Sequence, residues 1–190
     1  MSKQLKNTIK ALAALVILLA LVFVAFGPEK SLVVAFGPVE EISVDFKVLE
    51  LSAKPNQFLV CPEDYCQAKP NMISPVFAVS ALALKDRWMT MLADQPRITA
   101  GSGDDDTLQY NFVQRSALMR FPDSITVRFI ALDDSQSTLA IYSRSHYGRR
   151  DFGVNKARVQ AWLAALAYVS ATFAPKQQKT MRFRLPEFAR

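Results

Sequence analysis

The side chains that can carry chemistry are densest in one stretch, residues 142–159, which reads YSRSHYGRRDFGVNKARV. It contains the single histidine of the chain, His146, among serines, one aspartate and several arginines. The free backbone N–H groups and the dipole at a helix N-terminus favour binding of an anion, and arginines gathered there add positive charge. The stretch therefore predicts an anion or small-ligand site. Its candidate ligand-binding residues are Arg144, His146, Arg149, Arg150, Asp151, Asn155 and Arg158.

A strand, a turn and a helix must position these side chains. Side chains alternate along a strand, so Ser143 and Ser145 share one face while Arg144 and His146 share the other. Two glycines within residues 148–153 then allow the chain to turn.

A helix is expected to follow the turn. Asn155, or Asp151 about one turn earlier, can cap it by accepting hydrogen bonds from free backbone N–H groups. Its apolar positions recur at helical spacing, at Val159, Trp162, Leu163, Leu166, Val169 and Phe173.

Two other interpretations of the stretch stay open. The first is purely structural, because glycine, aspartate and asparagine are common in any strand-to-helix connection and surface arginines are usually solvated. The second is a hydrolase or transferase in which His146 works with Ser143, Ser145 or Asp151. Adjacent residues of a regular strand point to opposite faces, which counts against a pair of Ser145 and His146. No nucleophile elbow, phosphate loop or metal-ligand spacing occurs, so we name no catalytic residue, metal or cofactor.

Residues 143–155 resemble the signature of the domain-of-unknown-function fourteen-ninety-nine family, which is approximately S-x-S-R-x-G-x-x-D-x-G-x-N. The segment Arg120-Phe121-Pro122-Asp123 and a cysteine-containing start near Cys61 add to the resemblance, which covers residues 58–172. His146 and Tyr142 stand where the family commonly has arginines. The resemblance implies a small envelope or membrane-associated bacterial domain, with relatives in photosynthetic organelles, and it implies no reaction.

The N-terminus predicts a membrane anchor. Residues 11–26 are apolar and uncharged, they follow Lys3, Lys6 and Lys10, and they end at Gly27-Pro28. Lysines before an apolar run orient the N-terminus toward the cytoplasm. A run of this length covers about 24 Å, slightly less than the ~30 Å hydrocarbon core. A cleavable signal peptide is the alternative, but proline follows two of the small-residue patterns that resemble cleavage sites.

Cys61 and Cys66 predict a local disulfide. The domain is expected to face an oxidising compartment, where nearby cysteines pair. A zinc site would need two further ligands, and His146 is the only histidine.

The predicted fold class is α+β, with an N-terminal transmembrane helix followed by one antiparallel-sheet domain of about five strands and two main helices. Strands are expected near residues 42–48, 58–60, 97–100, 108–112, 125–132 and 138–145, a helix at 76–93, and a strand-like tail at 181–185. The expected segments are a basic cytoplasmic N-terminus at 1–10, a transmembrane signal-anchor at 11–27, a juxtamembrane linker at 28–40, an extracytoplasmic α+β domain at 41–174 and a basic C-terminal tail at 175–190.

The net charge and its distribution narrow the expected classes of binding partner. The net charge is +6, and the residues from Arg149 to the end contain nine Lys/Arg against Asp151 and Glu187. A basic C-terminal third suggests lipid headgroups or an acidic protein; nucleic acid is not expected, because a domain outside a membrane rarely meets it. We expect a single-pass protein of a bacterial inner membrane with its C-terminal domain in the periplasm. Its role is expected to be non-enzymatic binding of an anionic ligand, a lipid headgroup or a membrane-protein partner, or that of an accessory subunit in a larger membrane complex.

Overall fold

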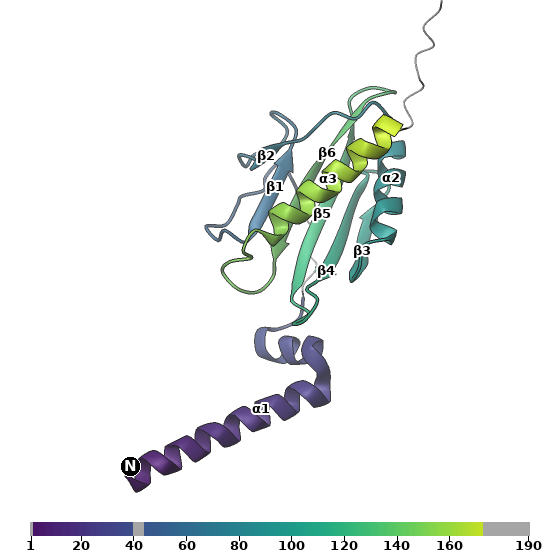
Figure 1. Ribbon diagram of the computed structural model, residues 1–190. Coiled ribbons are helices and arrows are strands. Elements are labelled where there is room, and N and C mark those ends of the chain that lie inside the picture. The colour runs from purple at the N-terminus through teal and green to yellow at the C-terminus, as the bar shows by residue number, and fades with distance from the viewer. Residues whose placement is uncertain (1, 40–43, 173–190) are drawn as a thin grey trace, which may run out of the picture.

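The computed structural model describes residues 2–39 and 44–172. A long N-terminal helix leads into a domain in which two helices cover one face of a sheet (Figure 1). The elements are α1 (Lys3–Phe36), β1 (Gln57–Cys61), β2 (Met72–Ile73), α2 (Ala81–Ala93), β3 (Ile98–Asp104), β4 (Gln109–Arg115), β5 (Pro122–Ala131), β6 (Ser137–Ser145) and α3 (Val154–Thr172).

The expected α+β class is confirmed, with two differences in the sheet. It has six strands rather than about five, in the order β2-β1-β6-β5-β4-β3. The extra strand is β2, whose two residues pair parallel to β1, so the sheet is mixed. The other neighbouring pairs are antiparallel, including the long pair of β5 and β6 that the sequence predicts.

The main core lies between the sheet and the two helices. Alternate residues of β5 and β6, among them Ile125, Val127 and Ile141, are fully buried there. Trp88 of α2 packs edge-on against Trp162 of α3, with ring centroids 5.4 Å apart. Burying such apolar surface is the dominant favourable term in folding, and here it holds α3 over β6. Ser80 accepts a hydrogen bond from the backbone N–H of Ala83, so α2 starts several residues later than expected.

A second, smaller core lies on the opposite face. Val44 and Phe46 are buried there against Leu59, Ala140 and Tyr142. The strand expected at 42–48 was wrong over its described part, because the chain turns at residues 46–48, where the backbone N–H of Lys47 bonds to Asp45 Oδ1 at 2.9 Å. The alternating burial comes from packing across β1 and β6 and not from strand pairing. Residues 42 and 43 lie outside the described part of the chain.

The disulfide predicted between Cys61 and Cys66 is present. Cys61 is the last residue of β1, so the bond ties the following loop to the sheet. Tyr65 packs on the smaller core, and the Lys47 ammonium lies 3.9 Å from the centre of its ring. The disulfide thus helps to hold the loop after β1 against the smaller core.

The N-terminal helix α1 is long and apolar enough to cross a membrane, with a mean hydropathy of 2.8 over 18 residues. It breaks at Gly27, where φ is 74°. Proline is well suited to the first turn of a helix, and after Pro28 the chain stays helical to Phe36, where the sequence predicts a linker. The expected strand at 181–185 and the basic tail at 175–190 lie outside the described residues.

The second part of α1 is attached to the sheet domain. Glu29 Oε1 lies 2.7 Å from Arg120 Nη2, and Glu29 Oε2 lies 3.7 Å from Arg115 Nε. The Tyr147 hydroxyl donates a 2.6 Å hydrogen bond to the carbonyl of Gly37, and its ring packs on Phe36. These contacts place the end of α1 against the turns at one end of the sheet (Figure 1).

Both edges of the sheet are irregular. One edge strand, β2, has only two residues, and the other, β3, has a register shift between Ala100 and Gly103. A Cβ added at Gly103 would lie 2.6 Å from the ring of Tyr110, so only glycine fits this close approach.

We predict that reducing the disulfide lowers the free energy of unfolding by about 2 kcal/mol, the cost of opening a short loop. Guanidinium unfolding of the full-length protein in detergent, with and without reductant, measures the change through Trp88 and Trp162 fluorescence. A variant with both cysteines changed to alanine should match the reduced protein and stop responding to reductant. Two free thiols in protein isolated under alkylating conditions would contradict the assignment.

Candidate functional site

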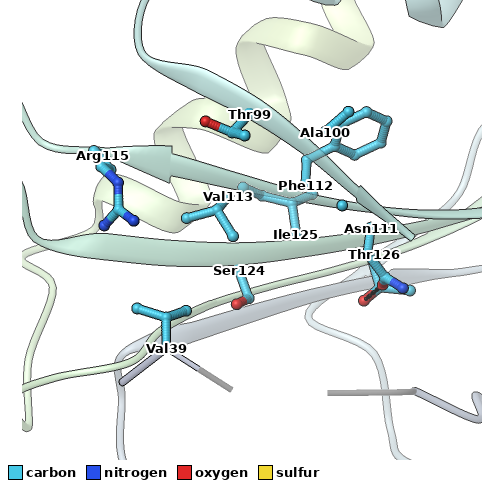
Figure 2. A pocket seen from close by; sticks show the side chains of 11 residues that line it. Val39, Thr99, Ala100, Asn111, Phe112, Val113, Arg115, Ser124, Ile125 and Thr126 are labelled. Carbon is cyan, nitrogen blue, oxygen red and sulfur yellow. Dashed lines mark hydrogen bonds between the residues drawn. The ribbon is translucent and has the colours of Figure 1, made fainter. Parts of the chain in front are cut away.

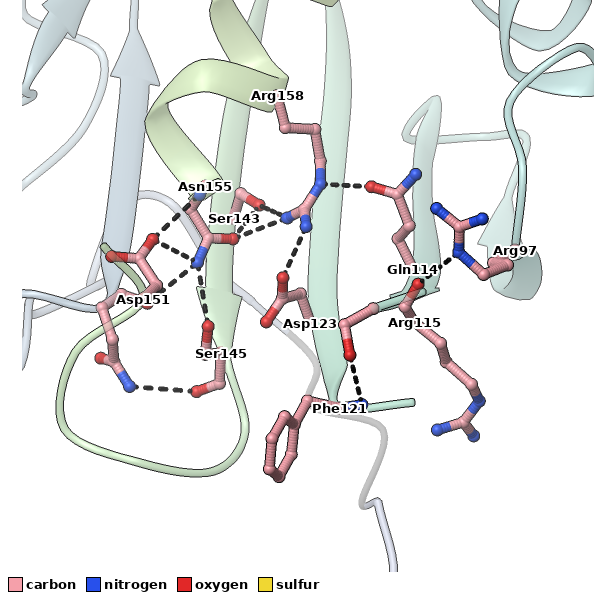
Figure 3. Close-up of polar contacts among 12 residues, drawn as sticks. Arg97, Gln114, Arg115, Phe121, Asp123, Ser143, Ser145, Asp151, Asn155 and Arg158 are labelled. Carbon is pink, nitrogen blue, oxygen red and sulfur yellow. Dashed lines mark hydrogen bonds and ion pairs between the residues drawn. The ribbon is translucent and has the colours of Figure 1, made fainter. Parts of the chain in front are cut away.

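Asn155, near the start of α3, is the centre of a buried polar network (Figure 3). Its side chain is fully buried, and its Oδ1 accepts hydrogen bonds from Ser143 Oγ at 2.6 Å and Arg158 Nη1 at 2.8 Å. Its Nδ2 faces Asp151 Oδ2 at 2.9 Å, Ser145 Oγ at 3.1 Å and the carbonyl of Asn56 at 3.2 Å. A side-chain amide has only two N–H hydrogens, so these three oxygens share them. Asn155 thus joins β6, the start of β1 and the β6–α3 turn.

Asp151 performs the capping that the sequence predicts for it or for Asn155. Its Oδ1 accepts a 3.1 Å hydrogen bond from the backbone N–H of Gly153, and its Oδ2 accepts one of 2.9 Å from that of Asn155. Burial raises the pKa of Asp151, but the hydrogen bonds from Asn155 and Gly153 outweigh it and hold the pKa below its usual value. The carboxylate therefore stays ionised at the helix start, where negative charge is favoured.

Arg158 forms the second part of the network, in which it contacts side chains from three neighbouring strands, β4, β5 and β6. Gln114 pairs with Asp123 in the sheet, and Asp123 pairs with Ser145. The guanidinium reaches Asp123 Oδ2 and Gln114 Oε1, both at 2.5 Å, and Ser143 Oγ at 3.0 Å. The side chains of Arg158 and Asp123 are only 8% and 11% exposed. Their charges neutralise each other inside the protein, so this arginine is not available to a ligand.

Asn56 closes the turn from the other side. Its Nδ2 donates a 3.0 Å hydrogen bond to the carbonyl of Gly148, and its own carbonyl accepts from the backbone N–H of Ser145 at 2.9 Å. The β6–α3 turn is therefore fixed at its start by Asn56 and at its end by Asp151 and Asn155.

Arg144 and His146 lie on the opposite face of β6, as strand alternation predicts. Arg144 borders the smaller core beside Val44 and Tyr142. His146 Nε2 lies 2.6 Å from Ser124 Oγ of β5. The described hydrogen bonds of Ser143 and Ser145 run to the α3 side of the sheet. The serine that faces His146 across the sheet is therefore Ser124, which the sequence interpretation did not consider.

The seven candidate residues do not form one cluster, because β6 divides them. Asp151, Asn155 and Arg158 lie on the α3 face in the network, whereas Arg144 and His146 lie on the other face. Arg149 and Arg150 are exposed in the turn between them. Within residues 2–39 and 44–172, no ion pair involves Arg149 or Arg150. Ligand binding at these residues stays a prediction, and the two turn arginines are the exposed ones among the seven.

A separate pocket of about 240 Å³ lies on the open face of the sheet (Figure 2). Its polar walls include Asn111, Thr126 and Ser124, and Asn111 already bonds to Thr126 at 2.6 Å. Val39, the last described residue before the gap at 40–43, forms one side. Among the described residues, no group of three or more His, Cys, Asp or Glu is placed to hold a metal ion.

The sequence interpretation missed Asp123, Gln114, Ser124 and Asn56. Asp123 had one signal, since it ends the Arg120–Asp123 segment that resembles the family pattern. The others depend on strand order: Gln114 and Ser124 meet their partners only because β4, β5 and β6 are neighbours.

Comparison with protein-family models matches residues 47–166 to the family described as protein of unknown function (DUF1499). The matched range contains the whole polar network and leaves out α1. Comparison with curated proteins finds no match.

We predict that Arg158→Met lowers the free energy of unfolding by about 3–5 kcal/mol, because it leaves the buried Asp123 carboxylate without its partner. Guanidinium unfolding of the full-length protein in detergent gives the midpoints. Asp123→Asn combined with Arg158→Met should recover part of the loss, since the unpaired charge is then absent. Lys156→Ala, at an exposed position of the same helix, should change the value by less than about 0.5 kcal/mol. Equal midpoints for Arg158→Met and Lys156→Ala would contradict a stabilising role for the network.

Proposed function

The chain belongs to the DUF1499 family of proteins of unknown function, and from this premise we propose that it is a membrane-anchored, non-enzymatic binding module. In this proposal α1 holds the protein in a bacterial inner membrane, and the sheet domain lies in the periplasm. The domain recognises an anionic group through Arg149 and Arg150 of the β6–α3 turn.

The proposal rests on the contrast between the buried, hydrogen-bonded polar residues at the β6–α3 turn and its two exposed arginines. Asp151, Asn155 and Arg158 bind one another and the strands, so their task is to shape the turn. Arg149 and Arg150 are presented to solvent by that rigid frame. A pre-shaped turn loses little backbone freedom on binding, which suits recognition of a ligand by the two arginines that it carries.

The anchor and the disulfide support the proposed location. Three lysines near the start of α1 favour a cytoplasmic N-terminus, which puts the sheet domain on the other side of the membrane. A disulfide between Cys61 and Cys66 persists in an oxidising compartment. Both features agree with a periplasmic domain.

We predict that Arg149→Ala combined with Arg150→Ala abolishes ligand binding while leaving the fold intact, because neither side chain belongs to the buried network. Native mass spectrometry of the full-length protein, extracted gently from its own membrane, detects the bound mass. Lys69→Ala with Arg87→Ala removes the same charge elsewhere and should keep that mass. Retention of the mass by the turn variant would contradict the proposal. A protein bound in fixed proportion, with no small ligand, would instead support an accessory subunit.

The pair of Ser124 and His146 favours a second candidate, a hydrolase or transferase. A serine whose hydroxyl lies within hydrogen-bond reach of a histidine can be activated as a nucleophile. Ser124 also lines the open-face pocket, where a substrate could meet it.

We predict that His146→Gln and Ser124→Ala both keep full biological function, since the binding role needs neither proton transfer nor a nucleophile. Growth or complementation of a deletion strain is the measurement, with denaturation midpoints as the control for folding. Loss of function in both variants at unchanged stability would favour the enzyme.

A further inference from the structure

Two turns at one end of the sheet expose large apolar side chains to solvent. Leu118, in the β4–β5 turn, is 82% exposed, and Phe152, in the β6–α3 turn, is 94% exposed. Met119 and Phe121 of the first turn and Val154 after the second are also exposed. Exposed apolar patches bordered by polar residues mark interaction surfaces. We refer to residues 116–121 and 146–153 as the paired turns.

The paired turns are neighbours in space. Asp123 lies two residues after the first turn and Ser145 immediately precedes the second, and the two are partners in the β5–β6 ladder. The backbone N–H of His146, which opens the second turn, donates a 3.1 Å hydrogen bond to the carbonyl of Pro122, which follows the first. The exposed apolar side chains therefore belong to one end of the domain and can meet a single surface.

The anchor ends against this same end. Arg120 of the first turn binds Glu29, and Tyr147 of the second binds the carbonyl of Gly37. Glu29 follows the apolar run of α1, which ends at Phe26, by three residues. Three residues span at most about 11 Å even when extended. If the apolar run of α1 spans a bilayer, the paired turns lie at its surface.

The backbone holds Phe152 outward against its own preference. Its φ is 55°, in the left-handed region that bulky side chains rarely adopt. The fixed network on either side, from Asp151 to Asn155, maintains this conformation. A strained residue kept fully exposed points to a role outside the fold.

The exposed positive charge of the second turn favours a bilayer with anionic lipids. Arg149 and Arg150 are exposed beside Phe152, and among the described residues neither has an acidic partner in an ion pair. Basic residues close to an anionic leaflet are attracted to it, and apolar residues beside them enter the boundary between headgroups and acyl chains. The paired turns combine both kinds of residue.

We propose that the paired turns dock onto an anionic bilayer leaflet, with Leu118 and Phe152 entering the headgroup region and Arg149 and Arg150 binding lipid phosphates. The proposal rests on the proposed function and names its anionic partner as the membrane surface beside the anchor. The domain is then held against the bilayer at two points, by α1 and by the paired turns.

The test is amide hydrogen exchange on the full-length protein in lipid nanodiscs. One set contains phosphatidylcholine alone, and the other includes about 30% phosphatidylglycerol, which supplies the negative surface potential. The paired turns should exchange roughly tenfold more slowly in the anionic discs, because docking must be broken before exchange. Residues 132–136, the β5–β6 hairpin at the far end with the half-exposed Leu132, should exchange equally in both.

Two variants and one control locate the effect. Leu118→Ser with Phe152→Ser, and separately Arg149→Ala with Arg150→Ala, should each remove the protection in anionic discs. Leu132→Ser should leave it unchanged. High salt should also reduce the protection, because it screens charges at an exposed surface.

Equal exchange of the paired turns in the two kinds of disc overturns the proposal, whether both are fast or both are slow. So does protection seen only in native membranes, which would indicate a protein partner. If the proposal fails in this way while the wild-type protein keeps an Arg149- and Arg150-dependent bound mass, the proposed function stands and only the bilayer docking is wrong.

Discussion

The structure depends on one buried side-chain amide, that of Asn155. A buried polar group is costly unless it is hydrogen-bonded, and this one is bonded on both sides, to Ser143 and Arg158 through its oxygen and to Asp151 through its nitrogen. The strand, the turn and the helix cannot move independently without breaking these bonds. The geometry of the β6–α3 turn therefore follows from Asn155 rather than from the exposed residues of the turn.

This dependence separates the specified residues of the family-like signature from the arginines at its unspecified positions. The serines, the aspartate and the asparagine satisfy each other inside the protein, so their pattern reflects folding. Arg149 and Arg150 occupy unspecified positions of that signature, and among the described residues neither takes part in the buried network. A signature can thus be mostly structural and still mark a functional surface, because the buried part determines where the exposed part points.

Local patterns in the sequence predicted much of this arrangement. The alternation along β6 correctly separated Ser143 and Ser145 from Arg144 and His146, and the spacing of the two cysteines indicated their bond. Partnerships across strands could not be foreseen, because Asp123 meets Arg158 only when β5 lies beside β6 under α3. Residues 44–48 misled for a similar reason: apolar residues alternate there as in a paired strand, but only Val44 and Phe46 are buried, in a segment packed across the sheet without strand pairing. The helix after Gly27 was hidden by the break before it.

The irregular sheet edges have a consequence if α1 spans a membrane, as proposed. Anchored copies of one protein diffuse in a plane at the same height, so their sheet edges meet far more often, and in better alignment, than those of a freely tumbling protein. An open, regular edge strand would then recruit the edge of a neighbour. The two residues of β2 offer too short a template, and the bulge of β3 between Ala100 and Gly103 interrupts the other edge. Neither edge therefore offers a long, regular template for pairing between copies.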